Sequence, residues 1–173
     1  MANRSANADA SLASDIWTVA VASGELQCLT AGDLSAAFPS WSPNGETIAF
    51  FAEHPLNARS NYEDAHLWLV SRTGGDQRDL MTHLDRTLAA VQPDYLFSTG
   101  TPSLWTPDGQ TIYVVSAEHG ANAIFALAVE GGDCWRVSST NADIVALQSV
   151  AASQTFVGVA ATPTQPYDLF TVP

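Results

Sequence analysis

The sequence has few basic residues. It carries 6 Lys and Arg against 18 Asp and Glu, which gives a net charge of −12 over 173 residues. Nucleic-acid binding needs clustered basic side chains that neutralise phosphates, so this balance argues against a nucleic-acid partner. The same deficit disfavours docking on an anionic membrane surface. A cationic partner is compatible with the charge, although solubility is the simpler explanation of it.

Cysteines and long apolar runs are also scarce. The two cysteines, Cys28 and Cys134, lie far apart and match no Cys-x-x-Cys or Cys/His metal spacing. No apolar run approaches the ~18 residues of a membrane-spanning helix. Residues 1–14 are rich in Ala, Ser and Asn and lack the apolar segment of a signal peptide. We predict that they form a flexible leader, and the missing signal favours a cytoplasmic location.

Patterns that carry chemistry are missing as well. There is no Gly-x-Ser-x-Gly nucleophile elbow and no glycine-rich phosphate loop. Glu53, Glu63 and Asp64 are grouped carboxylates, but their spacing fits no calcium-binding loop. The histidines match no metal-binding or catalytic spacing: His54, His66, His83 and His119. We therefore predict no catalytic residue, no metal and no cofactor in this chain.

What the sequence does contain is an internal repeat. Three segments open with a short apolar strand that ends in an aromatic residue: Asp15-Ile16-Trp17, His66-Leu67-Trp68 and Ala123-Ile124-Phe125. A glycine follows each aromatic residue by seven positions, and an apolar residue follows each glycine by five: Leu29, Leu80 and Val137. This spacing predicts a hairpin, because glycine supplies the positive φ that its turn requires. A fourth opening, Asp168-Leu169-Phe170, lies near residue 173.

A second repeated element alternates with the first. Residues 40–50 read Ser-Trp-Ser-Pro-Asn-Gly-Glu-Thr-Ile-Ala-Phe, and residues 104–114 read Leu-Trp-Thr-Pro-Asp-Gly-Gln-Thr-Ile-Tyr-Val. Pro-Asn-Gly and Pro-Asp-Gly are strong turn formers. The apolar run after each turn, 48–52 and 112–116, suits a strand that is buried on both faces. Residues 149–159 form a weaker third copy.

Together the two elements give about four short strands per repeat. The aromatic residues of the first element are 51, 57 and 45 residues apart, close to the period of propeller blades. We predict an all-β chain that forms a partial β-propeller of about three to four four-stranded antiparallel blades. The expected boundaries are 15–65, 66–122, 123–167 and a further blade or closing strand at 168–173. Trp residues at the repeat positions are expected to pack in the core, whereas Trp135 lies off the pattern.

These residues resemble the Trp-Ser-Pro-Asp-Gly repeats of TolB-like propellers. They are most similar to the propeller of the prolyl oligopeptidase family, in its acylaminoacyl-peptidase and dipeptidyl-peptidase-like branch. The similarity lies in Leu67-Trp68 with Gly74-Gly75, then 84–86, then 105–113, then Gly131-Gly132, and in the tail 162–170. It covers about residues 15–173.

The resemblance implies a non-catalytic role. In that family the propeller caps an α/β-hydrolase domain with a Ser-Asp-His triad, restricts substrates by size and supports oligomer contacts. The expected partners are the hydrolase domain of a longer parent, which would follow residue 173, and the parent's peptide substrates. Open blade edges also predict self-association, or closure of the strand near Trp17 with the strand near Phe170.

One loop could carry function for such a parent. Long loops often do, and the connection between Leu80 and Trp105 holds a group of polar residues: His83, Asp85, Arg86, Asp94 and Tyr95. The resemblance implies that such loops can face the cavity of the enzyme, while an ordinary insertion with solvated charges is the simpler explanation. Two other functions stay open, namely a stand-alone TolB-like scaffold for protein partners and a small lectin-like propeller that binds sugars or metal.

Overall fold

The computed structural model describes residues 13–30, 34–54, 65–84, 102–139, 142–149 and 155–172. The chain divides into two compact units, Met1–Arg86 and Thr87–Pro173. Each unit is described by itself.

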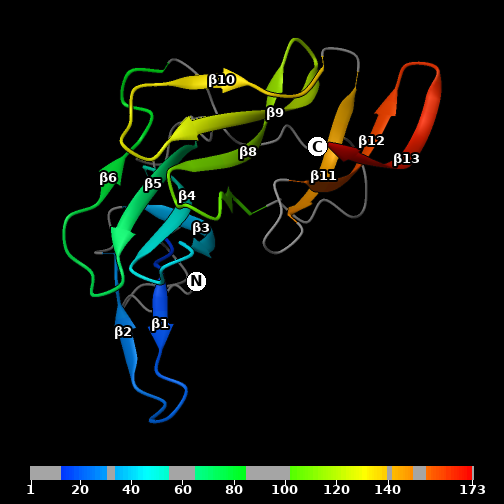
Figure 1. The fold of residues 1–173 in the computed structure, drawn as a ribbon. Helices are drawn as coiled ribbons and strands as arrows, with labels where there is room; N and C mark the ends of the chain where they lie inside the picture. Colours follow the sequence, from blue (N-terminus) through cyan, green and yellow to red (C-terminus); the bar gives the residue numbers. More distant parts are fainter. Residues whose placement is uncertain are drawn as a thin grey trace. The chain divides into compact units, whose positions relative to one another are not determined.

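Both units consist of antiparallel sheets (Figure 1). The first unit holds a hairpin of β1 (Trp17–Val19) and β2 (Leu26–Cys28), and a sheet of β3 (Ser35–Trp41), β4 (Thr47–Glu53), β5 (His66–Ser71) and β6 (Arg78–Asp79). The second unit holds a sheet of β7 (Leu104–Trp105), β8 (Thr111–Glu118), β9 (Ala121–Ala128) and β10 (Cys134–Arg136), and a sheet of β11 (Asp143–Ser149), β12 (Phe156–Thr162) and β13 (Gln165–Val172). In each four-stranded sheet the strands pair in sequence order. The expected all-β fold, a partial propeller of antiparallel blades, is confirmed.

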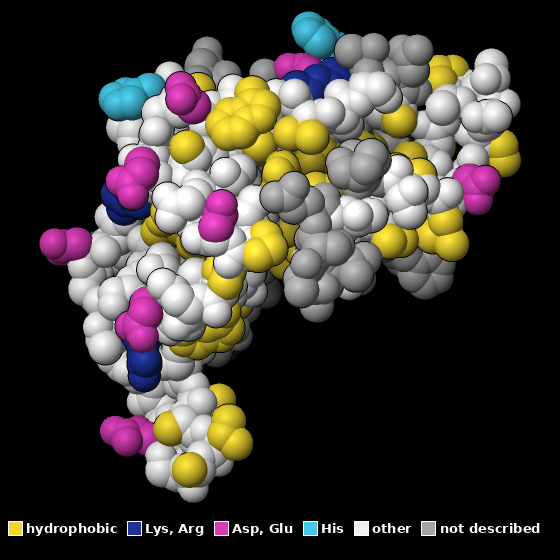
Figure 2. All heavy atoms as spheres, in the orientation of Figure 1, with side chains coloured by type: hydrophobic (Ala, Val, Ile, Leu, Met, Phe, Trp, Pro, Cys, Tyr) yellow, Lys and Arg dark blue, Asp and Glu magenta, His cyan; other side chains and the backbone are white. Residues whose placement is uncertain are grey.

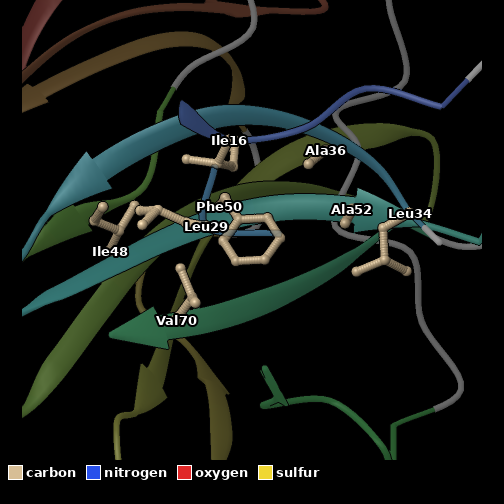
Figure 3. Close-up of a cluster of buried hydrophobic side chains, with 8 residues drawn as sticks. All are labelled: Ile16, Leu29, Leu34, Ala36, Ile48, Phe50, Ala52 and Val70. Atoms are coloured by element: carbon tan, nitrogen blue, oxygen red, sulfur yellow. The ribbon is translucent and has the colours of Figure 1, made fainter. Parts of the chain in front are cut away.

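The core of the first unit lies between the β1–β2 hairpin and the four-stranded sheet. Phe50 on β4 is fully buried and lies among the side chains of both layers (Figure 3). The cluster consists of Ile16, Leu29, Leu34, Ala36, Ile48, Phe50, Ala52 and Val70. All but Val70 fall within residues 16–52. The β1–β2 hairpin therefore packs against β3 and β4, the two strands that follow it in sequence.

The second unit repeats this arrangement. Val115 of β8 and Ile124 of β9 pack against Ile144, Leu147 and Phe156 of the next sheet. A polar link ties the same two sheets, because the Asp143 carboxylate accepts hydrogen bonds from the backbone N–H and the side-chain amide of Asn122, at 2.9 and 3.0 Å. In both units, the last strands of one sheet thus pack against the first strands of the sheet that follows in sequence.

A recurring hydrogen-bond pattern fastens the outer strands β2, β6 and β10. Leu29 donates its N–H to the Ile16 carbonyl at 2.9 Å. The Ile16 N–H donates to the Thr30 hydroxyl at 3.0 Å, and that hydroxyl donates to the Asp15 carboxylate at 2.8 Å. Thr30 is only 2% exposed. A single threonine side chain therefore satisfies one backbone donor and one carboxylate at the edge of the first core.

The same pattern recurs in the other copies of the repeat. In β9 and β10, Val137 donates its N–H to the Ile124 carbonyl at 2.8 Å, and the Ile124 N–H donates to the Ser138 hydroxyl at 3.0 Å. In β5 and β6, Leu80 donates to the Leu67 carbonyl at 2.9 Å. Met81 stands where the other copies have Thr or Ser, so the middle copy has no hydroxyl at this point.

The two Pro-x-Gly turns are built alike. The Ser42 hydroxyl donates to Asn44 Oδ1 at 2.7 Å, and the Thr106 hydroxyl donates to Asp108 Oδ1 at 2.6 Å. Each hydroxyl also accepts from a backbone N–H five residues on, at 2.9 and 3.0 Å. The glycine of each turn has φ of 70°, the left-handed conformation that glycine adopts without strain.

One expectation about the tryptophans differs from the structure. Trp41 sits at a repeat position, yet it is 52% exposed, because β3 is the edge strand of its sheet. Trp135, which lies off the repeat pattern, is 47% exposed. Position in the repeat therefore predicts the strand on which a tryptophan lies but not its burial.

Replacing Thr30 tests the hydrogen-bond pattern of the outer strand. We expect Thr30→Val to lower the free energy of unfolding by about 1 to 3 kcal/mol, because the buried Ile16 N–H loses its acceptor. Urea denaturation followed by tryptophan fluorescence measures the loss. Thr30→Ser keeps the hydroxyl and is the matched control; equal stability of the two variants would contradict this account.

Asp108 makes its turn sensitive to pH. Hydrogen bonds from Thr106 and the Gln110 backbone hold the pKa of Asp108 below its ordinary value of 3.8. The ionised carboxylate therefore stabilises the fold at pH values above the ordinary pKa. This contribution is lost as the pH falls through the lower pKa that Asp108 has in the folded protein. Asp108→Asn reproduces the Asn44 turn without a titrating group. We expect the wild type to lose more thermal stability than Asp108→Asn on acidification below 3.8, and parallel curves would argue against the assignment.

Candidate functional site

The loop group predicted from the sequence lies mostly outside the described residues. His83 is exposed in a turn after β6. Asp85, Arg86, Asp94 and Tyr95 fall in residues 85–101, outside the described part of the chain. Their placement toward a cavity stays a prediction.

The other polar candidates form no binding site in the described residues. Glu53 ends β4, while Glu63 and Asp64 lie outside the described ranges. Within those ranges no group of three or more His, Cys, Asp or Glu side chains could hold a metal ion. No helix in that part of the chain is long and apolar enough to span a membrane.

His66 and Asp79 form a pair at the end of the middle blade. His66 Nδ1 lies 2.7 Å from Asp79 Oδ2, and Asp79 Oδ1 accepts from the Met81 N–H at 2.7 Å. The pair sits beside Met81, where the other copies have Thr30 or Ser138. The pair links the first residue of β5 to the last residue of β6, which is a structural role.

Cys28 is held as a neutral thiol. Desolvation of the thiol and the nearby Asp15 carboxylate raise the pKa of Cys28. Its Sγ donates to the Thr30 carbonyl at 2.9 Å. A thiolate, and not a thiol, is the reactive nucleophile, so this environment does not favour nucleophilic chemistry.

A groove lies beside β13 in the second unit. It has a volume of about 670 Å³. It lies between the end of the β10 segment and β13, and it is lined by Val137, Ser138, Ser139, Ala142, Ile144, Ala160, Thr162 and residues 165–171. No sequence pattern predicts this groove, because its two sides come from different repeats.

The lining of this groove suits binding better than catalysis. Among the described residues that line it, only Asp168 is charged, and the others have apolar, hydroxyl-bearing or amide side chains. The described lining holds no His, Cys, Lys, Arg or Glu. The groove can therefore accept a chain with apolar side chains and a few hydrogen bonds.

Comparison of the sequence with curated proteins finds two informative relatives. The chain is 31% identical over 104 residues to an uncharacterised peptidase, YuxL, of Bacillus subtilis, a match that covers 60% of this chain and 13% of the peptidase. It is 34% identical over 55 residues to the Tol-Pal system protein TolB of Paramagnetospirillum magneticum, with 32% of this chain and 12% of TolB covered. The chain thus spans only a small part of these relatives. No family model matches it.

Solved structures agree on the fold. A puromycin-hydrolysing peptidase of Mycobacterium tuberculosis superposes with a TM-score of 0.66 at 18% identity, covering 91% of this chain and 22% of that one. The β-propeller domain of the Trilobed protease from Pyrococcus furiosus gives 0.54 at 15% identity, covering 86% and 40%. At this identity the likeness shows the fold alone. With the sequence relatives, it supports a propeller of the peptidase or TolB type.

Gly158 on β12 is packed tightly between its neighbours on β11 and β13. A Cβ atom at this position would lie 2.5 Å from the Phe170 ring and 2.7 Å from the Ala146 carbonyl oxygen. We expect Gly158→Ala to lower the free energy of unfolding by about 1 to 3 kcal/mol, since overpacking forces neighbours to shift. Thermal unfolding measures this, with the exposed Val157→Thr on the same strand as control. If Gly158→Ala unfolds at the same temperature as the wild type, Phe170 on β13 and Ala146 on β11 can move away from the added methyl group at little cost.

Proposed function

We propose that this chain is the non-catalytic propeller portion of a serine peptidase of the prolyl oligopeptidase family, in its acylaminoacyl-peptidase or dipeptidyl-peptidase-like branch. The observation that carries the proposal is the 31% identity to a peptidase over 104 residues. The order of the repeat motifs and the blade architecture support it. In this proposal the blades restrict the access of peptides to a triad that another domain supplies, and they support contacts between copies of the parent.

The absence of a nucleophile elbow from the sequence is consistent with this division of labour. The described groove lining also holds no His, Cys or Lys. A propeller portion needs rigid, sequential blades rather than reacting groups, and these blades are fastened by backbone bonds and buried hydroxyls.

An active-site probe on the native polypeptide tests the proposal. An antibody raised against residues 104–136 would isolate the polypeptide that contains this segment from its source, and a fluorophosphonate would label any activated serine in it. We expect a labelled polypeptide that hydrolyses short aminoacyl and acyl-aminoacyl substrates far faster than folded proteins. Residues 1–173 produced alone are the control and should stay unlabelled.

The outcomes separate the two candidate functions. A polypeptide that carries these blades but takes no label would overturn the peptidase proposal. The TolB-like scaffold is the second candidate, because 55 residues are 34% identical to a TolB protein. An unlabelled polypeptide isolated together with stable protein partners would favour that scaffold.

A further inference from the structure

The turn between β3 and β4 contains an asparagine that is followed by a glycine (Figure 1). Among the asparagines of the sequence, only Asn44 precedes a glycine. Asparagine is one of the thermolabile residues of proteins. A glycine after it has no Cβ atom to hinder the approach of its backbone nitrogen to the side-chain amide. Asn44 and Gly45 therefore form the pair at which these two groups can react with each other.

The surroundings of this pair are open. Asn44 is exposed and Gly45 is half-buried. A Cβ atom added to Gly45 would have no atom of the described residues within 4 Å. Water therefore reaches the Asn44 amide, and the backbone of the turn has room to move.

Two hydrogen-bond donors polarise the side-chain carbonyl of Asn44. Its Oδ1 accepts from the Ser42 hydroxyl at 2.7 Å and from the Glu46 backbone N–H at 3.1 Å. A backbone N–H can only donate, so the oxygen of the amide, and not its nitrogen, lies at this point. Donors on a carbonyl oxygen stabilise the negative charge that develops there when a nucleophile adds to the carbon. The turn therefore favours attack on Asn44 Cγ.

One hydrogen bond of the turn opposes this attack. The Gly45 N–H donates to the Ser42 carbonyl at 2.9 Å, and the nitrogen cannot react while it is held there. The turn must therefore open locally, which an exposed loop does at much lower free energy than the unfolding of a sheet. We expect the reaction to be several-fold slower than in a free peptide of the same sequence.

The matched turn of the second unit shows that an aspartate fits in this place. Asp108 precedes Gly109 as Asn44 precedes Gly45. Its Oδ1 accepts from the Thr106 hydroxyl at 2.6 Å and from the Gln110 N–H at 3.0 Å. These hydrogen bonds hold the pKa of Asp108 below its ordinary value of 3.8, so a turn of this kind favours an ionised carboxylate.

We propose that Asn44 is a site of spontaneous deamidation in the folded protein, and that the turn holds the aspartate product as it holds Asp108. The Gly45 nitrogen attacks Asn44 Cγ and forms a C–N bond, and ammonia leaves from the side-chain amide. The proton that the Gly45 nitrogen loses passes through solvent to the departing ammonia, and a succinimide ring remains. Water then opens the ring to aspartate or isoaspartate. The net reaction consumes water and releases ammonia, without oxidation or reduction. This inference does not rest on the peptidase proposal.

The turn also selects between the two products. Aspartate keeps the length of the backbone and can form the side-chain hydrogen bonds seen at Asp108. Isoaspartate adds a carbon to the backbone, which disturbs the bonds from Gly45 to Ser42 and from Ser42 to Thr47. Because isoaspartate can close to the ring and open again, we expect aspartate to accumulate in the folded protein.

Peptide mapping by mass spectrometry tests the proposal on the 173-residue chain. After incubation at neutral pH below the unfolding temperature, we expect the segment that contains Asn44 to gain the mass difference between asparagine and aspartate. Asn122 is the internal control, because it is 5% exposed and its amide donates to Asp143, and it should stay unchanged. A protease that cleaves before aspartate but not before isoaspartate identifies the product.

Two variants locate the reaction. Asp108→Asn places an Asn-Gly pair in the second turn, so it should convert at a comparable rate and regenerate the wild-type residue. Thr30→Val weakens the first unit without touching the turn, so Asn44 should convert at the same rate in this variant as in the wild type. Asn44→Asp is the product made directly, and it should unfold at the same temperature as the wild type at neutral pH.

Three results would overturn the proposal. The first is an Asn44 that stays intact while a free peptide of residues 40–48 converts. The second is faster conversion in Thr30→Val, which would place the reaction in the unfolded chain. The third is accumulation of isoaspartate, or a clearly lower unfolding temperature of Asn44→Asp, because either would show that the turn does not hold the aspartate.

Discussion

The structure depends on one constraint, which is that its central strands are apolar on both faces. Five consecutive residues of β4 and six of β9 are buried, and an isolated sheet cannot cover both of its sides. Each sheet therefore needs a neighbour. In the first unit the β1–β2 hairpin covers the face that carries Phe50, and in the second unit β11 and β12 cover the face that carries Ile124. The hydrogen bonds of Thr30 and Ser138 then fix the outer strands against these cores.

The sequence was sufficient to predict the strands and turns, but not which strands lie at the edge of a sheet or which side chains are buried. An aromatic residue, a glycine and an apolar residue, such as Trp17, Gly24 and Leu29, recur at fixed spacings because a hairpin has a fixed geometry. The hairpins could therefore be predicted from the local sequence. The turns at Gly45 and Gly109 were predictable for the same reason. The exposure of Trp41 was not, because it depends on β3 being an edge strand, and edge position is decided by pairing between distant segments.

The groove beside β13 shows the same limit for function. No catalytic or ligand-binding motif contains Ser138, Ala142 or Asp168, and only the fold of the second unit brings them together. The predicted polar loop illustrates the converse, because His83 is exposed and its four companions lie outside the described residues. Motif searches find chemistry that is local in sequence.

Exposed apolar side chains also gather on the tip of the β1–β2 hairpin (Figure 2), where Val19, Val21 and Leu26 reach solvent.

The repeated segment of the sequence does not coincide with one sheet, because it begins in one sheet and continues into the next. This arrangement has an evolutionary consequence. Residues 16–52 hold the outer hairpin of one blade, the inner strands of the next and almost all of the core between them. Duplication of such a segment copies the packing interface between two blades together with the strands that form it. Propellers of this construction can gain or lose whole blades without first evolving a new interface.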